Sequence, residues 1–182
     1  MTRLLMRSML TLSLATATRY HGEQAVDQAI EYYGTAREDV PEHAIHLILH
    51  EGFVPGVYTD TKGIETEGVG LTGDFIGQDF FTEVLPVFEA RARRITPEWD
   101  TLPQNTKNAI ISAVYRGDLK PTHKTAEHIR NREWEAASIE YLNNRDYLNS
   151  KAKNDKAGKV VHGVQARMEE NARAFIKTEQ SK

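Results

Sequence analysis

Apolar residues spaced three and four positions apart predict two short helices near the start of the chain. The first ends at Gly34, and the second begins around Pro41 and ends at Gly52. Glycine commonly follows the last residue of a helix, and proline is tolerated in the first turn. In the second helix the expected buried stripe is Ala44, Ile45, Ile48 and Leu49.

The spacing of polar and apolar residues changes after the second helix. Tyr58 and the residues from Ile64 onward are typical of two strands, and the residues between them, 60–63, are typical of a turn. Gly68 and Gly70 indicate bends or a close approach of two backbones. We therefore expect a β-hairpin that is rich in glycine.

From Gly77 onward the pattern predicts only helices, with Pro86 dividing one of them in two. The apolar residues expected to pack these helices are Ile110, Ile111, Val114, Ile129, Trp134, Ile139, Val164, Met168, Ala172, Phe175 and Ile176. The predicted fold is α+β and mostly α. Its β structure is a small hairpin lobe, and the rest is a helical bundle lobe.

The first twenty residues have a different character. Arg3 and Arg7 precede a short apolar run from Met9 to Ala17, which resembles a weak signal peptide or a membrane-tethering segment. The run is too short to span a bilayer. We interpret it as an amphipathic arm, with a secretory signal as the alternative, and predict that residues 1–40 are separate from a domain formed by residues 41–182.

Composition excludes several classes of site. The chain has no cysteine, which rules out a disulfide scaffold, a thiolate metal site and a cysteine nucleophile. A net charge of −3 gives no indication of nucleic-acid binding. Residues 115–182 carry 14 basic against 10 acidic side chains, which suits contact with an anionic polymer or simply a solvated helical surface.

Three polar residues in or beside the predicted hairpin are candidates for catalysis. Glu51 ends its helix, where the helix dipole and partial burial both favour the protonated carboxyl of a general acid. Asp60 lies in the turn, where aspartate caps backbone N–H groups and stays ionised. Thr66 follows on the second strand of the hairpin. Its hydroxyl can hold a water near Asp60; the alternative is that threonine occurs here only because it favours strands. One protonated and one ionised carboxylate are what glycoside hydrolysis requires.

The second helix also carries three histidines. His43, His46 and His50 fall at positions i, i+3 and i+7, near one face, a spacing compatible with a metal site. No carboxylate or fourth ligand is evident beside them. From the sequence we therefore expect no metal and no cofactor.

The stretch from His50 to Gly70 resembles the phage-type lysozymes, glycoside hydrolase family twenty-four. That family has Glu-Gly at a helix end, then Tyr-x-Asp-x-x-Gly in a hairpin, then Thr-x-Gly-x-Gly. The corresponding residues are Glu51, Gly52, Tyr58, Asp60, Gly63, Thr66, Gly68 and Gly70, without a gap. The resemblance extends more loosely over residues 41–180.

The resemblance implies a lysozyme-like catalytic domain over residues 41–182 that cuts the β-1,4 bond between N-acetylmuramic acid and N-acetylglucosamine. Glu51 would be the general acid, and Asp60 and Thr66 would position and activate the water, with inversion at the sugar carbon. Tyr58 and Gly70 would support the substrate site. Of the basic residues in the last helix, Arg167 is the one expected to reach Glu51.

The resemblance also implies a setting. The protein would be a monomeric phage product that needs no cofactor and acts on peptidoglycan strands in the host periplasm, during lysis or during penetration by the virion. Residues 1–20 would contact a membrane or a virion protein. The alternative is a catalytically weak lysozyme fold used for binding or as a virion part. Glu65 and Glu67 favour it, because the family usually has an aromatic and an aliphatic residue there.

Overall fold

The computed structural model describes residues 11–12, 18–160 and 163–179. Its fold is α+β and mostly helical, as predicted, with eight α-helices in these ranges and a small sheet. The chain forms two compact units, Met1–Val87 and Phe88–Lys182, and the boundary between them falls within helix α3 (Leu85–Ile95).

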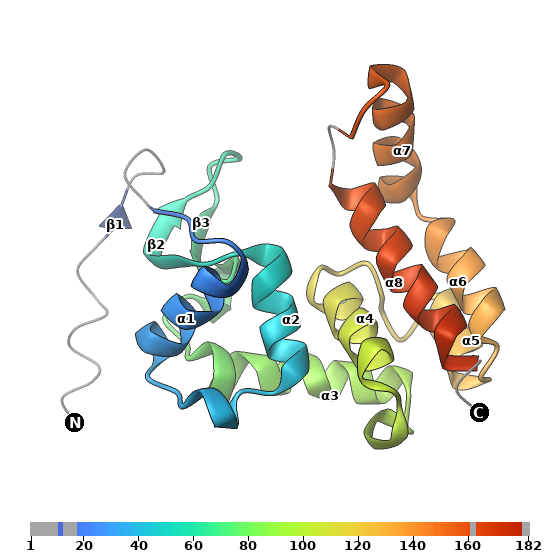
Figure 1. Ribbon diagram of the computed structural model, residues 1–182, viewed down its shortest axis with the longest axis horizontal. Coiled ribbons are helices and arrows are strands. Elements are labelled where there is room, and N and C mark those ends of the chain that lie inside the picture. The colour runs from blue at the N-terminus through green and yellow to red at the C-terminus, as the bar shows by residue number, and fades with distance from the viewer. Residues whose placement is uncertain (1–10, 13–17, 161–162, 180–182) are drawn as a thin grey trace. The chain divides into compact units, whose positions relative to one another are not determined.

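The first unit contains the whole sheet (Figure 1). Its elements are β1 (Thr11–Leu12), α1 (Gly22–Tyr33), α2 (Glu42–Glu51), β2 (Val54–Thr59), β3 (Glu65–Gly68) and β4 (Leu71–Thr72). The strands lie in sequence order, with β1 parallel to β2 and the other pairs antiparallel. In the predicted hairpin, which is confirmed, Tyr58 pairs with Thr66 and Thr59 with Glu65.

Both predicted helix ends in this unit are confirmed. The residues that follow α1 and α2 are Gly34 and Gly52, with φ of 68° and 74°, which favour glycine. The predicted buried stripe of α2 is partly wrong, because its buried residues are His43, Ala44, Leu47 and Ile48. Leu49 is 36 % exposed. The helix packs against α1, and the face turned inward is one residue removed from the one predicted.

An aromatic cluster forms the core of the first unit. The ring of Tyr33, from α1, lies 6.0 Å from the ring of Phe53 and 5.7 Å from the ring of Phe81, both edge to face. Phe80 and Phe81 belong to a helical turn that follows the sheet. Edge-to-face packing of this kind stabilises beyond simple area burial. Helix α1 is therefore part of the same core as the hairpin.

This packing bears on domain organisation. The predicted domain boundary between residues 1–40 and 41–182 stays a prediction, while the compact units divide after Val87. Most of the expected N-terminal arm, residues 1–10 and 13–17, lies outside the described residues. Among the described residues, none of the helices is both long enough and apolar enough to cross a membrane.

The helical segment around Pro86 is continuous, which corrects the prediction that this proline divides it. A π-helical turn, Phe80–Val84, leads directly into α3. Proline has no N–H to donate within a helix. The change from π to α hydrogen bonding therefore takes place just before Pro86, and the chain does not leave the helix.

The second unit consists of helices. Besides the part of α3 that follows Val87, they are α4 (Gln104–Tyr115), α5 (Lys124–Arg130), α6 (Trp134–Leu142), α7 (Arg145–Ala157) and α8 (Val164–Glu179). Helix α8 packs against α4, α6 and α7 (Figure 1). The residues confirmed as buried are Ile110, Ile111, Val114, Ile129, Trp134, Met168, Ala172 and Phe175.

Three residues of this unit that were expected in the core are not buried. Ile139 is 67 % exposed, Ile176 is 38 % exposed, and Val164 is half-buried. The buried face of α6 carries Trp134, Ala137, Ser138 and Tyr141. Ile139 lies off this face because it does not share the spacing of three and four residues that places side chains on one side of a helix.

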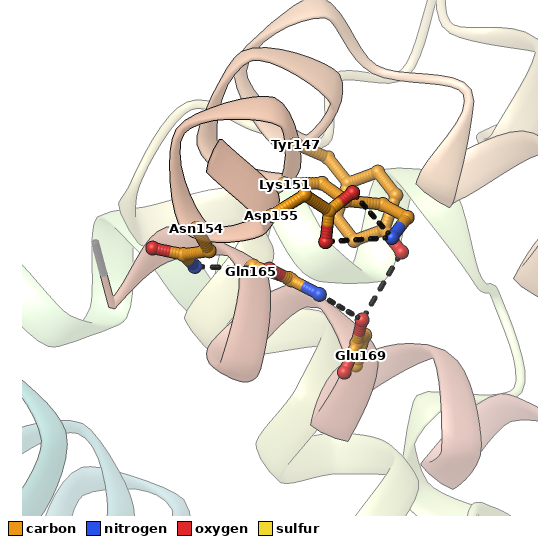
Figure 2. A network of polar contacts seen from close by, with 6 residues as sticks. All are labelled: Tyr147, Lys151, Asn154, Asp155, Gln165 and Glu169. Carbon is orange, nitrogen blue, oxygen red and sulfur yellow. Dashed lines mark hydrogen bonds and ion pairs between the residues drawn. The ribbon is translucent and has the colours of Figure 1, made fainter. Parts of the chain in front are cut away.

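Helix α7 was not among the predicted elements, because it has no apolar stripe. Its buried residues are Ser150 and Asn154, both polar. Asn154 donates to Gln165 of α8 at 2.9 Å, and Gln165 and Tyr147 donate to the same oxygen of Glu169, at 2.9 and 3.1 Å (Figure 2). Hydrogen bonds thus replace apolar contacts in holding α7 to α8.

Candidate active site

Glu51 is the last residue of α2, and its side chain is half-buried. The chain turns sharply at Gly52, whose N–H still donates to the carbonyl of Ile48 at 2.8 Å. A Cβ at Gly52 would lie 2.8 Å from the carbonyl oxygen of Tyr20, too close for any other residue. The helix end that carries Glu51 is therefore fixed by a backbone approach that only glycine permits.

Arg19 joins two of the predicted site residues, and nothing in the sequence indicated it. It donates to the carbonyl of Glu51 at 3.2 Å and to the hydroxyl of Tyr58 at 2.9 Å. Its guanidinium carbon also lies 5.7 Å from the centre of the Tyr58 ring, within cation–π range. Arg19 precedes Tyr20, which pairs with Phe53 through two backbone hydrogen bonds, and this pairing places the arginine at the helix end.

Asp60 caps the hairpin turn. Its Oδ1 accepts hydrogen bonds from the backbone N–H groups of Lys62 at 2.8 Å and Ile64 at 2.9 Å. These bonds, that from Ile64 above all, hold the pKa of the Asp60 carboxyl below its usual range. The carboxylate is consequently ionised at neutral pH. Among the described residues, none donates to Oδ2, which leaves that oxygen as an acceptor for water.

Thr66 lies in the middle of the sheet, between Tyr58 of β2 and Thr72 of β4. Its side chain is 5 % exposed, and its hydroxyl donates to the carbonyl of Ile64 at 3.1 Å. Asp60 and Thr66 therefore both bind the backbone of Ile64, one through its N–H and the other through its carbonyl. The hydroxyl keeps its lone pairs as acceptors.

The two glutamates on either side of Thr66 have different environments. Glu65 is exposed, whereas Glu67 is only 2 % exposed. Glu67 accepts hydrogen bonds from the Tyr32 hydroxyl at 2.9 Å and from the N–H of Gly77 at 2.6 Å. Its carboxylate therefore ties α1 and the loop after β4 to the central strand.

Glycine is required at Gly68 and at Gly70 for different structural reasons. Gly68 has φ of 61°, and a Cβ there would lie 2.3 Å from the Tyr33 hydroxyl, so close approach requires glycine. Gly70 has φ of 93° with open space around it, and its N–H donates to the carbonyl of Glu67 at 3.1 Å. Gly70 thus marks a bend, as predicted, whereas Gly68 marks the close approach of a side chain and not of a second backbone.

Arg167 lies on α8 and is half-buried, within the second compact unit. Its predicted contact with Glu51 stays a prediction. The other candidate residues all belong to the first unit, in the stretch from the end of α2 to the turn after β3; they are Glu51, Tyr58, Asp60, Thr66 and Gly70.

The arrangement combines two carboxylates with different environments. Glu51 stands half-buried at the carboxyl end of a helix. Asp60 stands in a turn, where backbone N–H groups favour its ionised form. Such a difference in environment is the usual way in which two carboxyl groups take acid and base roles in one site.

Comparison with family models, with curated proteins and with solved structures found no match to this chain.

Proposed function

We propose that this protein is a peptidoglycan muramidase that cleaves the β-1,4 bond between N-acetylmuramic acid and N-acetylglucosamine. The observation that carries the proposal is the placement of half-buried Glu51 at a helix end and of Asp60, held ionised by two backbone N–H groups, in the hairpin that follows. These two carboxyl groups suit the general acid and the water-activating base of an inverting glycosidase.

In the proposed reaction, Glu51 donates its proton to the glycosidic oxygen as the bond to the sugar carbon breaks. A water molecule adds to that carbon from the opposite face. The proton of the water passes to Asp60 through Oδ2, while Oδ1 keeps its two backbone hydrogen bonds. Thr66 orients the water through the hydroxyl lone pairs, and the product sugar has inverted configuration.

The direct test is clearing of permeabilised Gram-negative cell walls by the purified protein. We expect wild type to clear them and Glu51→Gln to lose at least about a hundredfold in rate, the usual contribution of a general acid. Glu65→Gln is the matched control, because Glu65 is an exposed glutamate of the same hairpin. Equal clearing by wild type and Glu51→Gln, or none by either, would contradict the proposal.

Mass analysis of the digested glycan identifies the bond and the reaction. Reducing ends on muramic acid indicate a lysozyme, and anhydro ends indicate a transglycosylase. The anomeric configuration of the fresh product, followed by NMR, distinguishes inversion from retention, because the two mechanisms deliver opposite anomers.

A second candidate is a catalytically weak lysozyme-like fold that binds glycan strands or serves as a virion part. The observation favouring it is that Oδ1 of Asp60 and the Thr66 hydroxyl are both used to hold the hairpin turn. Such a protein would sediment with insoluble peptidoglycan yet release no soluble reducing ends. Release of those ends by wild type, and not by Glu51→Gln, excludes it.

For the biological setting we propose a phage product that acts in the host periplasm, in lysis or in penetration by the virion. The expected contact of residues 1–20 with a membrane or a virion protein belongs to this proposal. Extraction of the full chain from membranes, compared with that of a chain lacking residues 1–20, tests the membrane contact.

A further inference from the structure

His46 and His50 lie on successive turns of α2, on one face of the helix. Their ring centres are 4.3 Å apart, and one nitrogen of each ring lies within 4.8 Å of a nitrogen of the other. Both side chains are half-buried, so that the helix limits their motion while solvent still reaches them. His43 has a different environment, since it is buried in the first turn of the helix.

The separation of the two rings is close to that of a metal chelate. Imidazole nitrogens bind Zn²⁺ at about 2.0–2.1 Å, so two of them at a tetrahedral ion lie about 3.4 Å apart. Rotation of the two side chains about their own bonds would bring the nitrogens, which lie within 4.8 Å, to that distance. The backbone of α2 thus holds two ligands ready, which lowers the entropy lost on binding.

The position on the helix also favours a cation. His50 is in the last turn of α2, the end of the helix at which the dipole places a partial negative charge. A bound divalent ion is therefore attracted by the partial negative charge of this helix end.

We propose that His46 and His50 form a chelate for a divalent transition-metal ion, with water completing its coordination. The absence of a carboxylate among the three histidines argued against a metal, but a two-imidazole chelate needs none. Imidazole suits Cu²⁺, Ni²⁺ and Zn²⁺, with Cu²⁺ bound most tightly, whereas Mg²⁺ and Ca²⁺ require oxygen ligands. The site does not depend on the proposed muramidase activity.

Calorimetric titration of the untagged full-length protein with CuCl₂, ZnCl₂ and MgCl₂ tests the proposal. We expect one Cu²⁺ and one Zn²⁺ per chain at this site, with Cu²⁺ tighter, and no heat of binding for Mg²⁺. His46→Ala and His50→Ala should each weaken Zn²⁺ binding at least about tenfold, since even loss of a supporting residue around a metal costs that much. His123→Ala is the control, because His123 precedes α5 in the other unit.

NMR signals of the individual histidine rings show which histidines bind the metal ion. Addition of Cu²⁺ at less than one equivalent should broaden the ring proton signals of His46 and His50 before those of the other histidines. Unchanged Zn²⁺ affinity in both single variants, an equal loss in His123→Ala, or no Zn²⁺ binding in wild type overturns the proposal. Circular dichroism of each variant shows whether a loss of binding reflects a loss of folding, and a folded variant with lost binding supports the chelate.

Discussion

At the scale of single residues, the buried carboxylate of Glu67 holds three segments together. It accepts hydrogen bonds from Tyr32 and Gly77. Glu67→Gln leaves one acceptor oxygen and places an NH₂ group against a donor, so a buried donor loses its partner. We expect the free energy of unfolding, measured in urea, to fall by about 1–3 kcal/mol.

Glu65→Gln is the matched control for this change, since Glu65 is exposed two residues away on the same strand. It should alter the free energy of unfolding by less than about 0.5 kcal/mol. Equal effects of the two substitutions would show that the hydrogen bonds of Glu67 contribute nothing to stability.

The stability of the turn at Asp60 should decrease in acid. Its folded pKa lies below the unfolded one, because backbone N–H groups stabilise the ionised form. The stabilisation is therefore fully present above the unfolded value, about pH 4, and is lost as the pH falls through the folded value. Protection of the Lys62 and Ile64 amides against hydrogen exchange can be followed by NMR between pH 2 and 5. In wild type it should decrease as the pH is lowered.

Asp60→Asn provides the comparison for this acid dependence. Asparagine caps the same kind of turn but does not ionise. Protection of the two amides should then stay level over the same range, after correction for the intrinsic exchange rate. An identical decline in both proteins would assign the acid dependence to another group.

At the scale of elements, α7 is attached to α8 by polar side chains (Figure 2). Few apolar contacts and a solvent-facing surface are features of segments that open locally. We expect amides of α7 to exchange at least about tenfold faster than those of α8, a difference of about 1.4 kcal/mol in opening free energy. Hydrogen exchange read by mass spectrometry measures this directly.

Two substitutions within α7 sharpen the comparison. Asn154→Ala removes the buried hydrogen bond to Gln165 and should raise exchange of α7 further. Lys153→Ala, at an exposed neighbouring position, should leave it unchanged. Similar exchange in α7 and α8, insensitive to Asn154, would mean that α7 is as firmly held as the core.

At the scale of the whole molecule, α1 and the hairpin share one core within Met1–Val87. Each fully buried large side chain contributes about 1.5–3 kcal/mol. Helix α1 buries Val26 and Tyr33 in this core. Loss of these two side chains alone is therefore comparable with the whole stability of a small unit. We expect a fragment of residues 41–182 to lack a cooperatively folded first unit, as judged by the amide dispersion of its NMR spectrum.

Val26→Ala combined with Tyr33→Ala in the full chain tests the same contact without removing backbone. It should lower the free energy of unfolding of the first unit by several kcal/mol, about 3 or more. A fragment 41–182 with the hairpin spectrum of the full chain would instead support a domain boundary at residue 40.

Local signals predicted most of the elements and most of the candidate site. The glycines after α1 and α2 mark helix ends that depend only on neighbouring residues, and the turn at Asp60 follows from turn chemistry. The spacing of Glu51, Asp60 and Thr66 is also a local property. Each of these features involves residues close together in the chain, which is why a pattern can reveal it.

Other features depend on contacts between distant segments. Arg19 reaches Tyr58 across 39 positions, and Tyr32 reaches Glu67 across 35. Helix α7 has no apolar stripe to announce it, because its buried face makes hydrogen bonds. Ile139 has the composition of a core residue but lies on the exposed side of α6.

The sequence by itself therefore determined where the hairpin and its neighbouring helices begin and end, and which polar residues lie on them. Those properties come from backbone preferences and short-range hydrogen bonding. Only the tertiary structure decided that Glu67 is buried and joins three segments, and that Arg19 connects Glu51 with Tyr58. Burial and side-chain partners are set by packing, and packing joins residues that the order of the chain keeps apart.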